Sequence, residues 1–425
     1  MYRNMHRFFD SLRAILKDVL VLARLLAAAL LTGLLLTQPA HAQNAQTVRI
    51  GLIGSFSGMG ASQALVDNMR NAVLMAVDER NSFTGGILGK RIELIERDDK
   101  ADPASASATA KALASEGVVA VLAIQPSAMA EASQGAFQKA KIPVMQLLAT
   151  SDKVTAEFAP PNAATNYIFR VGINDSVQIR FLVSEMLEQK KFSRIGVMFD
   201  QSPSSLAARN SLEAQLREKS MGLIFSEQFE SDNAADVRDV MQKAKAANLD
   251  ALVVWSDAVG SALAVASRTE AKLRTPVYLN WSLSLPPAAH ISKNPPGDVV
   301  FIQTFIPGAI ILRRNEFVNA VSRRFGKTAL AATMAQAQAY DGCNLLLQAI
   351  QQATTTLRPD SVRQALETLN APWRGVIAMY RNPFTAREHE AINLEDLVAA
   401  RFKGNEIIYL EPEEERRIML AKDGH

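Results

Sequence analysis

From residue 48 to about residue 298, short runs rich in β-branched and aliphatic residues alternate with longer segments of helical periodicity. The first run is Val48–Ile53, and the segment after it places apolar residues at steps of four, namely Leu65, Met69, Val73 and Val77. Such a rhythm is typical of parallel sheets covered by helices on both faces. It runs through residues 48–168 and again through residues 170–298. We therefore predict an α/β protein with two Rossmann-like lobes, each built on its own parallel sheet.

Apolar periodicity and turn residues give the individual elements of these two blocks. The expected strands cover residues 48–53, 91–95, 118–123, 142–148, 194–199, 222–226, 251–255 and 276–280. The expected helices end near residue 81, extend from residue 103 to residue 117, and cover residues 128–140, 206–219, 234–247 and 258–273.

After residue 298 the rhythm changes, and no third parallel sheet is predicted. Three helices are expected first, at residues 315–325, 332–353 and 359–369. Short strands are expected after them, at residues 375–380, 397–403 and 406–409. Helices and strands without a sheet of their own need partners, so the chain is expected to return to the two earlier blocks.

This return of the chain divides the mature protein into two discontinuous lobes. We assign residues 48–168 and 300–375 to the N-terminal lobe, and residues 169–299 and 376–410 to the C-terminal lobe. Residues 411–425 are expected to form an exposed tail. The lobes would be joined by three crossovers, near residues 167–171, 299–304 and 375–383.

The N-terminus has the order of a secretory signal peptide. Residues 1–24 carry five basic side chains, an apolar stretch covers Leu25–Leu36, and Ala40-His41-Ala42 supplies small residues for cleavage before Gln43. The alternative is an uncleaved anchor, but the apolar stretch is shorter than the roughly 20 residues that span a bilayer. A lipoprotein would carry cysteine in place of Gln43. We therefore expect residues 1–42 to be removed and the mature protein to be exported, soluble and free of a lipid anchor.

Charge and cysteine content exclude several classes of function. The chain of 425 residues has 46 Lys and Arg against 43 Asp and Glu, a net charge of +3 at pH 7 and one cysteine. The whole basic excess lies in the signal peptide, and no basic cluster appears elsewhere, so nucleic acid is not an expected partner. The single Cys343 permits no internal disulfide and no multi-cysteine metal site.

The catalytic motifs that the chain suggests are incomplete. Gly85–Lys90 is similar to a phosphate-binding loop, but Thr84 replaces its first glycine and Arg91 its magnesium-binding hydroxyl. His389 and Glu390 are not followed by the second histidine of a zinc-protease helix. We therefore expect no enzyme, no cofactor and no metal site.

Small or polar residues follow the predicted strands of the first block. Phe56 lies between two serines after the first strand, Ser127 follows the third strand, and Ala149 and Thr150 follow the fourth. Ligands of open α/β sheets bind beyond the carboxyl ends of strands. Ser127 also opens the helix expected at residues 128–140, where its hydroxyl and free backbone N–H groups can receive a carboxylate. The alternative is that Ser127 only caps this helix.

Read in order, these segments resemble the leucine/isoleucine/valine family of periplasmic substrate-binding proteins of ABC importers. The landmarks of the resemblance are Ile50–Gly58, Gly85–Gly89, Asp98–Pro103, Ala123–Ala128, Leu148–Asp152, Tyr167–Asp175 and Ala339–Asp341. They extend over nearly the whole mature chain. The resemblance implies a type I periplasmic binding protein, a Venus-flytrap fold in which two lobes close on a ligand about three crossovers.

The resemblance also implies roles for residues at the strand ends. Ser127, the backbone of Ala149 and the hydroxyl of Thr150 would hold a ligand carboxylate on the first lobe. Asp175 would face a ligand ammonium across the cleft. This division is chemically consistent, because a desolvated carboxylate needs several donors and an ammonium needs an anion.

The second lobe departs from the family pattern at three positions. Ser204 replaces a usual tyrosine, Trp281 stands at or near a usual glutamate, and Asp257 lies where an aromatic contact is common. The carboxylate half of the site is thus kept and the ammonium half is altered. We predict a carboxylate or small amide whose flat remainder packs on Trp281 or Trp255. The alternatives are that each tryptophan fills the core of its lobe and that Asp257 is an exposed loop residue.

The implied function is capture of a small amino-acid-like, carboxylate or amide solute in the periplasm by hinge closure. A monomer would deliver this solute to an inner-membrane ABC permease with its ATPase. The alternative is a soluble sensor of the same fold that presents its ligand to a receptor or regulator, since fold does not fix function. An exported hydrolase is the weakest alternative, because no nucleophile and base can be paired.

Overall fold

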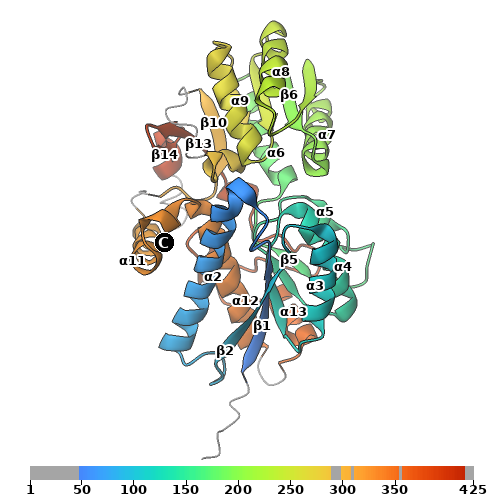
Figure 1. Ribbon diagram of the computed structural model, residues 1–425, viewed down its shortest axis with the longest axis vertical. Coiled ribbons are helices and arrows are strands. Elements are labelled where there is room, and N and C mark those ends of the chain that lie inside the picture. Colours follow the sequence, from blue (N-terminus) through green and yellow to red (C-terminus); the bar gives the residue numbers. More distant parts are fainter. Residues whose placement is uncertain (1–46, 289–297, 308–310, 354–356, 417–425) are drawn as a thin grey trace, which may run out of the picture. The chain divides into compact units, whose positions relative to one another are not determined.

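The two predicted parallel sheets are present, and each is the centre of its own lobe (Figure 1). The computed structural model describes residues 47–288, 298–307, 311–353 and 357–416. The predicted signal peptide with its cleavage site lies outside the described residues, and so do residues 417–425 of the predicted tail. We name the lobes first and second after the order of their sheets along the chain.

The sheet of the first lobe has five strands in the order β2-β1-β3-β4-β5, and all neighbours are parallel. Its strands are β1 (Val48–Gly54), β2 (Ile92–Asp98), β3 (Ala120–Ile124), β4 (Val144–Gln146) and β5 (Ile168–Arg170). The first four strands were predicted within a few residues. The fifth was expected to be only a crossover.

The sheet of the second lobe has seven strands in the order β14-β13-β10-β9-β8-β6-β7. Its parallel strands are β6 (Ile195–Asp200), β7 (Phe225–Phe229), β8 (Ala251–Trp255), β9 (Val277–Leu279) and β10 (Val299–Gln303). Its antiparallel edge strands are β13 (Val398–Lys403) and β14 (Glu406–Tyr409). A separate two-stranded ribbon is formed by β11 (Trp373–Arg374) and β12 (Met379–Tyr380).

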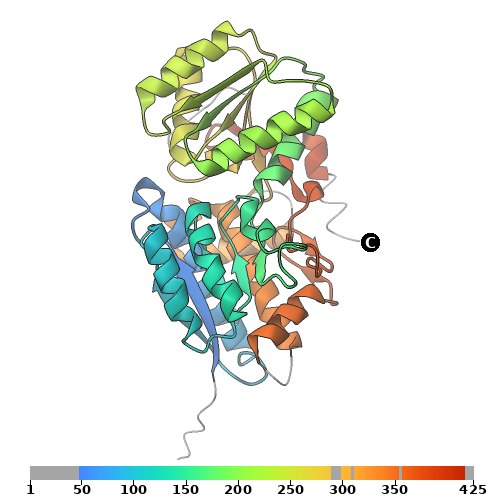
Figure 2. The ribbon, with the colours of Figure 1, turned by 90° about the vertical axis from the view of Figure 1, so that its right-hand side faces the viewer.

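Helices cover both faces of each sheet (Figures 1 and 2). The helices of the first lobe are α2 (Gln63–Phe83), α3 (Pro103–Ala114), α4 (Ser127–Ala140), α5 (Lys153–Ala156), α12 (Thr333–Gln352) and α13 (Pro359–Glu367). The helices that follow β5 and the strands of the second sheet are α6 (Asp175–Ser184), α7 (Pro203–Glu218), α8 (Ala234–Ala246), α9 (Ala258–Glu270) and α11 (Leu312–Phe325). The shorter elements are the 3₁₀ helices Gly60–Ser62, Trp281–Ser284, Lys327–Leu330 and Leu394–Asp396 and the π-helix Glu185–Gln189.

The alternation along β1 explains how the first lobe buries both faces of its sheet. Ile50 and Leu52 belong to the core that includes residues of α2 and α12, whereas Ile53 belongs to the core beneath α3 and α4. Side chains of a strand point alternately to opposite faces, so an apolar run fills both layers. Gly51 keeps α3 close, because a Cβ atom there would lie 2.8 Å from Cδ2 of Leu113.

The lobe boundaries follow the strands, and two of the predicted boundaries fall inside strands. The boundary after residue 168 lies inside β5, which belongs wholly to the first sheet. The boundary after residue 299 lies inside β10, which pairs with β9 and β13, so residues 300–303 belong to the second sheet. Both strands are short apolar runs, and periodicity alone does not separate a last strand from a crossover. The predicted boundary after residue 375 is also too early, because residues 389–391 still pair with β5 of the first sheet.

Two buried charged side chains hold the crossovers that follow β10 and α13. Arg314 of α11 is 1% exposed and donates to the carbonyl oxygens of Thr304 (3.1 Å) and Ile377 (3.4 Å). Asp341 of α12 accepts the backbone N–H groups of Val376 and Ile377, each at 2.8 Å. Burial raises the pKa of Asp341 to about 6, although these hydrogen bonds act to lower it. The described ends of the second and third crossovers are therefore tied to one another.

Candidate functional site

The predicted carboxylate-binding serine lies at the start of α4, but it is not the residue that caps this helix. Pro126 occupies the N-cap position, and Ser127 is the first helical residue. The Ser127 Oγ atom accepts hydrogen bonds from the backbone N–H groups of Thr150 (3.2 Å) and Ser151 (3.1 Å). The capping alternative for Ser127 is therefore wrong. The Ser127 hydroxyl links α4 to the loop after β4. Because both lone pairs of its oxygen accept these N–H groups, the hydroxyl proton points away from them.

The loop Ala149–Ser151, which we call the β4 loop, also contacts the first turn of α6. The backbone N–H of Asp175 donates to the carbonyl oxygen of Thr150 at 2.9 Å. In the next residues, Asp152 accepts the backbone N–H (3.2 Å) and the hydroxyl (2.6 Å) of Ser176. Because α6 packs against α7 of the second lobe, these contacts connect the predicted carboxylate-binding loop with the second lobe.

Asp175 and Ser204, two predicted site residues of the second lobe, are direct hydrogen-bond partners. Ser204 Oγ donates to Asp175 Oδ2 at 2.8 Å, and Asp175 is 3% exposed. Burial raises the pKa of Asp175 from 3.8 to about 7, and the Asp152 carboxylate adds to this shift. Hydrogen bonds from Ser204 and Thr150 and the charge of Arg170 oppose it. At neutral pH the Asp175 carboxyl is therefore only partly ionised, which weakens it as a partner for an ammonium.

Hydrogen bonds thus join Ser127, Thr150, Asp175 and Ser204 into one network, and in the described part of the chain they do not extend to Phe56 or Asp257. Phe56 lies beside Arg70, whose guanidinium carbon is 5.6 Å from the ring centroid. Asp257 is exposed and caps α9 by accepting the N–H of Gly260 at 2.8 Å. This exposed position at a helix start favours the alternative interpretation, in which Asp257 is an exposed residue outside the ligand site.

The two tryptophans considered as ligand platforms both lie in the apolar core. Trp255 at the end of β8 is 2% exposed, and Trp281 after β9 is 5% exposed. The backbone N–H of Trp281 donates to Oε1 of Gln178 at 3.2 Å, one turn of α6 beyond Asp175. Both tryptophans therefore fill the core, as the alternative predicted, and the backbone of Trp281 contacts α6 near Asp175.

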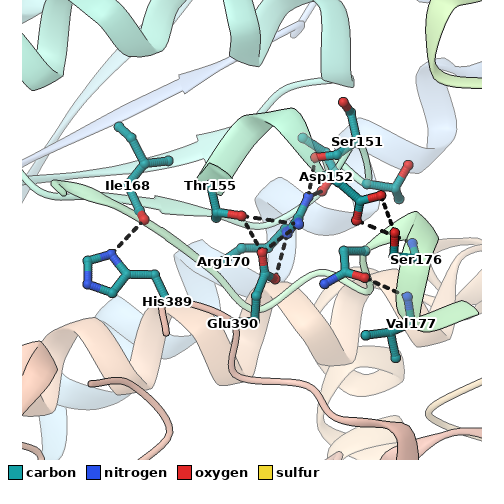
Figure 3. A network of polar contacts seen from close by, with 12 residues as sticks. Ser151, Asp152, Thr155, Ile168, Arg170, Ser176, Val177, His389 and Glu390 are labelled. Carbon is teal, nitrogen blue, oxygen red and sulfur yellow. Dashed lines mark hydrogen bonds and ion pairs between the residues drawn. The ribbon is translucent and has the colours of Figure 1, made fainter. Parts of the chain in front are cut away.

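The most extensive contacts at the β4 loop come from Arg170, which is paired with Glu390, and sequence reasoning assigned neither residue to the site (Figure 3). Arg170 is fully buried, and its Nη1 donates to the carbonyl oxygens of Ser151 (2.7 Å) and Ala149 (3.3 Å). Its Nε and Nη2 donate to the two carboxylate oxygens of Glu390 at 2.8 and 2.5 Å. Arg170 was visible as part of the landmark Tyr167–Asp175. No local pattern pairs it with a glutamate 220 positions later.

His389, considered above as half of a zinc motif, supports this pair structurally. Its Nδ1 lies 2.9 Å from the carbonyl oxygen of Ile168, and its ring stacks on Phe169 with 3.8 Å between centroids. Its Nε2 lies 3.4 Å from the Glu367 carboxylate. The histidine therefore attaches the segment that carries Glu390 to β5.

Comparison with known proteins agrees with this architecture. The periplasmic binding protein family matches residues 47–404. Leu/Ile/Val-binding protein homolog 7 of Brucella suis biovar 1 (strain 1330) is 25% identical over 367 residues, which cover 82% of this chain and 86% of that protein.

Two solved structures share the fold. The branched-chain amino acid transporter substrate-binding protein of Streptococcus pneumoniae, in complex with isoleucine, aligns with a TM-score of 0.69 and 20% identity over 85% of this chain and 98% of that one. An ABC-transporter solute-binding protein of R. palustris, in complex with 4-hydroxybenzoate, aligns with a TM-score of 0.70 and 15% identity over 86% and 95%.

The fold defines a two-lobed α/β protein whose sheets are joined by three crossovers. The chain belongs to the periplasmic binding protein family, and its relatives include proteins named for leucine, isoleucine and valine binding. The predicted family resemblance and the predicted fold class are therefore confirmed. Among the helices that the structure describes, none combines the length and apolar character needed to cross a bilayer.

Proposed function

We propose that this chain is the substrate-binding component of an ABC importer, and that it captures a small carboxylate by closing its two lobes. The observation that carries the proposal is the junction at the β4 loop, where Ser127, Thr150, Asp175 and Ser204 form one network between α4, the loop and the start of two second-lobe helices. A ligand that contacts both sides of this junction favours the closed form to the extent that it binds that form better.

The ligand that we propose is a carboxylate without an obligatory ammonium group. The first-lobe side offers the Ser127 hydroxyl at the start of a helix of 14 residues, where partial positive charge favours an anion. The second-lobe side offers the Asp175 carboxyl. Because its pKa is raised to about 7, this carboxyl is only partly ionised at neutral pH and is a weak partner for an ammonium. In two solved relatives the ligands are isoleucine and 4-hydroxybenzoate, and the feature common to both is a carboxylate. A flat, neutral remainder such as that of 4-hydroxybenzoate therefore fits this arrangement better than the ammonium of leucine.

The cellular context follows from the same proposal. The basic and apolar segments of residues 1–42 support export to the periplasm with cleavage before Gln43, and Gln43 in place of cysteine supports a form without a lipid anchor. The partners would be an inner-membrane permease and its ATPase, and the binding protein would act as a monomer. The family match supports ligand binding, not catalysis, as the activity of the chain.

A thermal-shift screen of the mature protein tests this function. The full chain would be expressed with its leader, purified from the periplasm, and checked by mass spectrometry for an N-terminus at Gln43. It would then be screened against aromatic acids, short dicarboxylates, small amides and branched-chain amino acids. A ligand at about 100 times its dissociation constant stabilises a protein by about 2.7 kcal/mol. We expect aromatic or other flat carboxylates to raise the melting temperature and Ser127→Ala to reduce this rise by half or more.

The screen has two contrary outcomes with different meanings. Stronger stabilisation by leucine, isoleucine or valine would contradict the proposed ligand and leave the importer function in place. No stabilisation by any compound would contradict the proposed capture of small carboxylates and favour a sensor with another class of ligand.

A further inference from the structure

Arg170 holds the carbonyl oxygens of the β4 loop on one side of the loop. Ser127 holds the N–H groups of the same loop on the other side. The carbonyl oxygens of Ala149 and Ser151 accept from the Arg170 guanidinium, and that of Thr150 accepts from the backbone N–H of Asp175. The N–H groups of Thr150 and Ser151 point the other way, to Ser127 Oγ. A carbonyl oxygen carries partial negative charge, so this orientation removes repulsion from the side where a carboxylate would bind.

The Arg170 guanidinium has no spare capacity to bind a ligand itself. It makes five hydrogen bonds, two to the β4 loop, two to Glu390 and one to the hydroxyl of Thr155 at 3.4 Å. A guanidinium has five N–H donors in a planar fork, so this partner set occupies the group. The bidentate Glu390 carboxylate compensates its buried charge, and Thr155 also donates to Glu390.

Glu390 is itself held in place by the backbone on either side of it. The N–H of Arg170 donates to the carbonyl oxygen of His389 at 2.9 Å, and the N–H of Ala391 donates to the carbonyl oxygen of Arg170 at 3.0 Å. Residues 389–391 therefore extend the edge of the first sheet beside β5 as a parallel bridge. This segment follows the β11–β12 ribbon in the chain, and Figure 3 shows its residues His389 and Glu390 beside Ile168 and Arg170.

We propose that Arg170 and Glu390 are a positioning pair for the carboxylate-binding loop, a role that rests on the proposed function. The pair orients the peptide groups of residues 149–151 and attaches them to residues 389–391, which lie beside β5. Loss of the Glu390 charge leaves the buried guanidinium uncompensated, so the loop loses its fixed orientation while Ser127 is unchanged. Ligand affinity then falls although no group that touches the ligand has been altered.

The test compares Glu390→Gln with Glu116→Gln in the full mature protein. Glu116 is a matched control because it also forms a bidentate pair with an arginine of the first lobe: Nε and Nη2 of Arg97 donate to its two carboxylate oxygens at 3.0 and 2.5 Å. Its side chain is 23% exposed, and its hydrogen bonds in the described part of the chain do not involve the β4 loop. Hydrogen exchange of the Thr150 and Ser151 amides is followed by mass spectrometry with residue-level fragmentation, without any ligand. Binding of 4-hydroxybenzoate and of isoleucine is measured by calorimetry on the same samples.

We expect Glu390→Gln to accelerate exchange at Thr150 and Ser151 by about tenfold or more, because their hydrogen bonds then open locally. We expect it to weaken binding of whichever probe the wild type binds by about tenfold, the equivalent of one good hydrogen bond. Glu116→Gln should leave both quantities unchanged even where it lowers the melting temperature. A second variant, Thr155→Val, should act in the same direction with a smaller effect and keeps the test valid if Glu390→Gln does not fold.

Unchanged exchange and unchanged affinity in a folded Glu390→Gln or Thr155→Val protein would overturn the positioning role. Equal effects of Glu390→Gln and Glu116→Gln would also overturn it, because the effects would then reflect general destabilisation. If the wild type binds neither probe, the proposed ligand class fails, while the exchange comparison still decides whether the pair orients the loop.

Discussion

The first-lobe half of the candidate site consists mainly of backbone groups, which are held around the Ser127 hydroxyl, whereas the second-lobe half consists of side chains. In the β4 loop, Ser127 and Arg170 fix the direction of the peptide groups from opposite sides. On the second lobe, the polar groups at the junction are the Asp175 carboxyl and the Ser204 hydroxyl. Backbone groups do not change with sequence or with pH, whereas both side chains change with sequence and the carboxyl also ionises with pH. Specificity can therefore drift on the second lobe while the first lobe keeps its chemistry.

The largest effect expected from this difference is a dependence of stability on pH that originates in the second-lobe half. The pKa of Asp175 is about 7 in the folded protein and 3.8 in its ordinary state. Between these values the folded protein retains a proton that the unfolded chain has lost. The free energy of unfolding should therefore decrease as the pH rises from about 4 to 7, by about 4 kcal/mol at most. Urea unfolding at several pH values measures this slope.

Asp175→Asn is the variant that assigns the slope to this residue. Asp341, with a pKa of about 6, contributes in the same direction, so Asp341→Asn serves as the second reference. Carboxylates with lowered pKa values, such as Asp98 and Asp250, act in the opposite direction but below about pH 4. Parallel stability curves for the wild type and Asp175→Asn between pH 4 and 7 would contradict the assignment.

The next effect concerns the first-lobe half and should not depend on pH. Ser127→Ala leaves the N–H groups of Thr150 and Ser151 without their acceptor and should cost about 2 kcal/mol of unfolding free energy. It should also weaken carboxylate binding about tenfold or more, since the hydroxyl itself is lost. Urea unfolding at pH 5 and pH 8, together with calorimetry, measures both effects.

Ser202→Ala is the matched control, because Ser202 caps α7 and accepts the N–H of Ser205 at 3.1 Å. Loss of a cap should cost about 1 kcal/mol without any change in ligand affinity. If the two variants lowered affinity equally, the β4 loop would not be the carboxylate-binding half.

The sequence predicted this backbone half well because its signals are local. Strands β1 to β4 and the helices between them each carry a period and a turn, so the loops after the strands could be placed from their neighbours in the chain. Ser127 and Thr150 were named on that basis, and the structure brings them within hydrogen-bond distance.

The remaining features of the site depend on contacts between distant segments. Arg170 and Glu390 meet through the register of β5 with residues 389–391, and nothing in either local sequence encodes that register. The same reason explains why β10 was not predicted as a strand. It is a short apolar run, and its partner strands β9 and β13 lie before and after it in the sequence. The burial of Trp281 and the raised pKa of Asp175 are likewise properties of the packed second lobe, not of the residues alone.

The smallest effect expected is at the hydrogen bond between the two side chains of the second-lobe half. Ser204→Ala removes a donor that stabilises the ionised form of Asp175, so the pKa of Asp175 should rise further. The loss of unfolding free energy should be about 1 kcal/mol, and it should appear above pH 7, where the carboxylate is ionised. Carbon-13 NMR of the labelled Asp175 carboxyl measures the pKa directly.

Ser205→Ala is the control for the loss of a serine hydroxyl in the same turn. Ser205 bonds to Ser202 through its backbone N–H, which this variant retains. This variant should leave the pKa of Asp175 where it is in the wild type. A pKa that does not move in Ser204→Ala would mean that burial and the first-lobe groups Asp152, Thr150 and Arg170 govern the carboxyl without Ser204. The titrating group would then be controlled from the first lobe, and the contrast between a backbone half and a side-chain half would no longer hold.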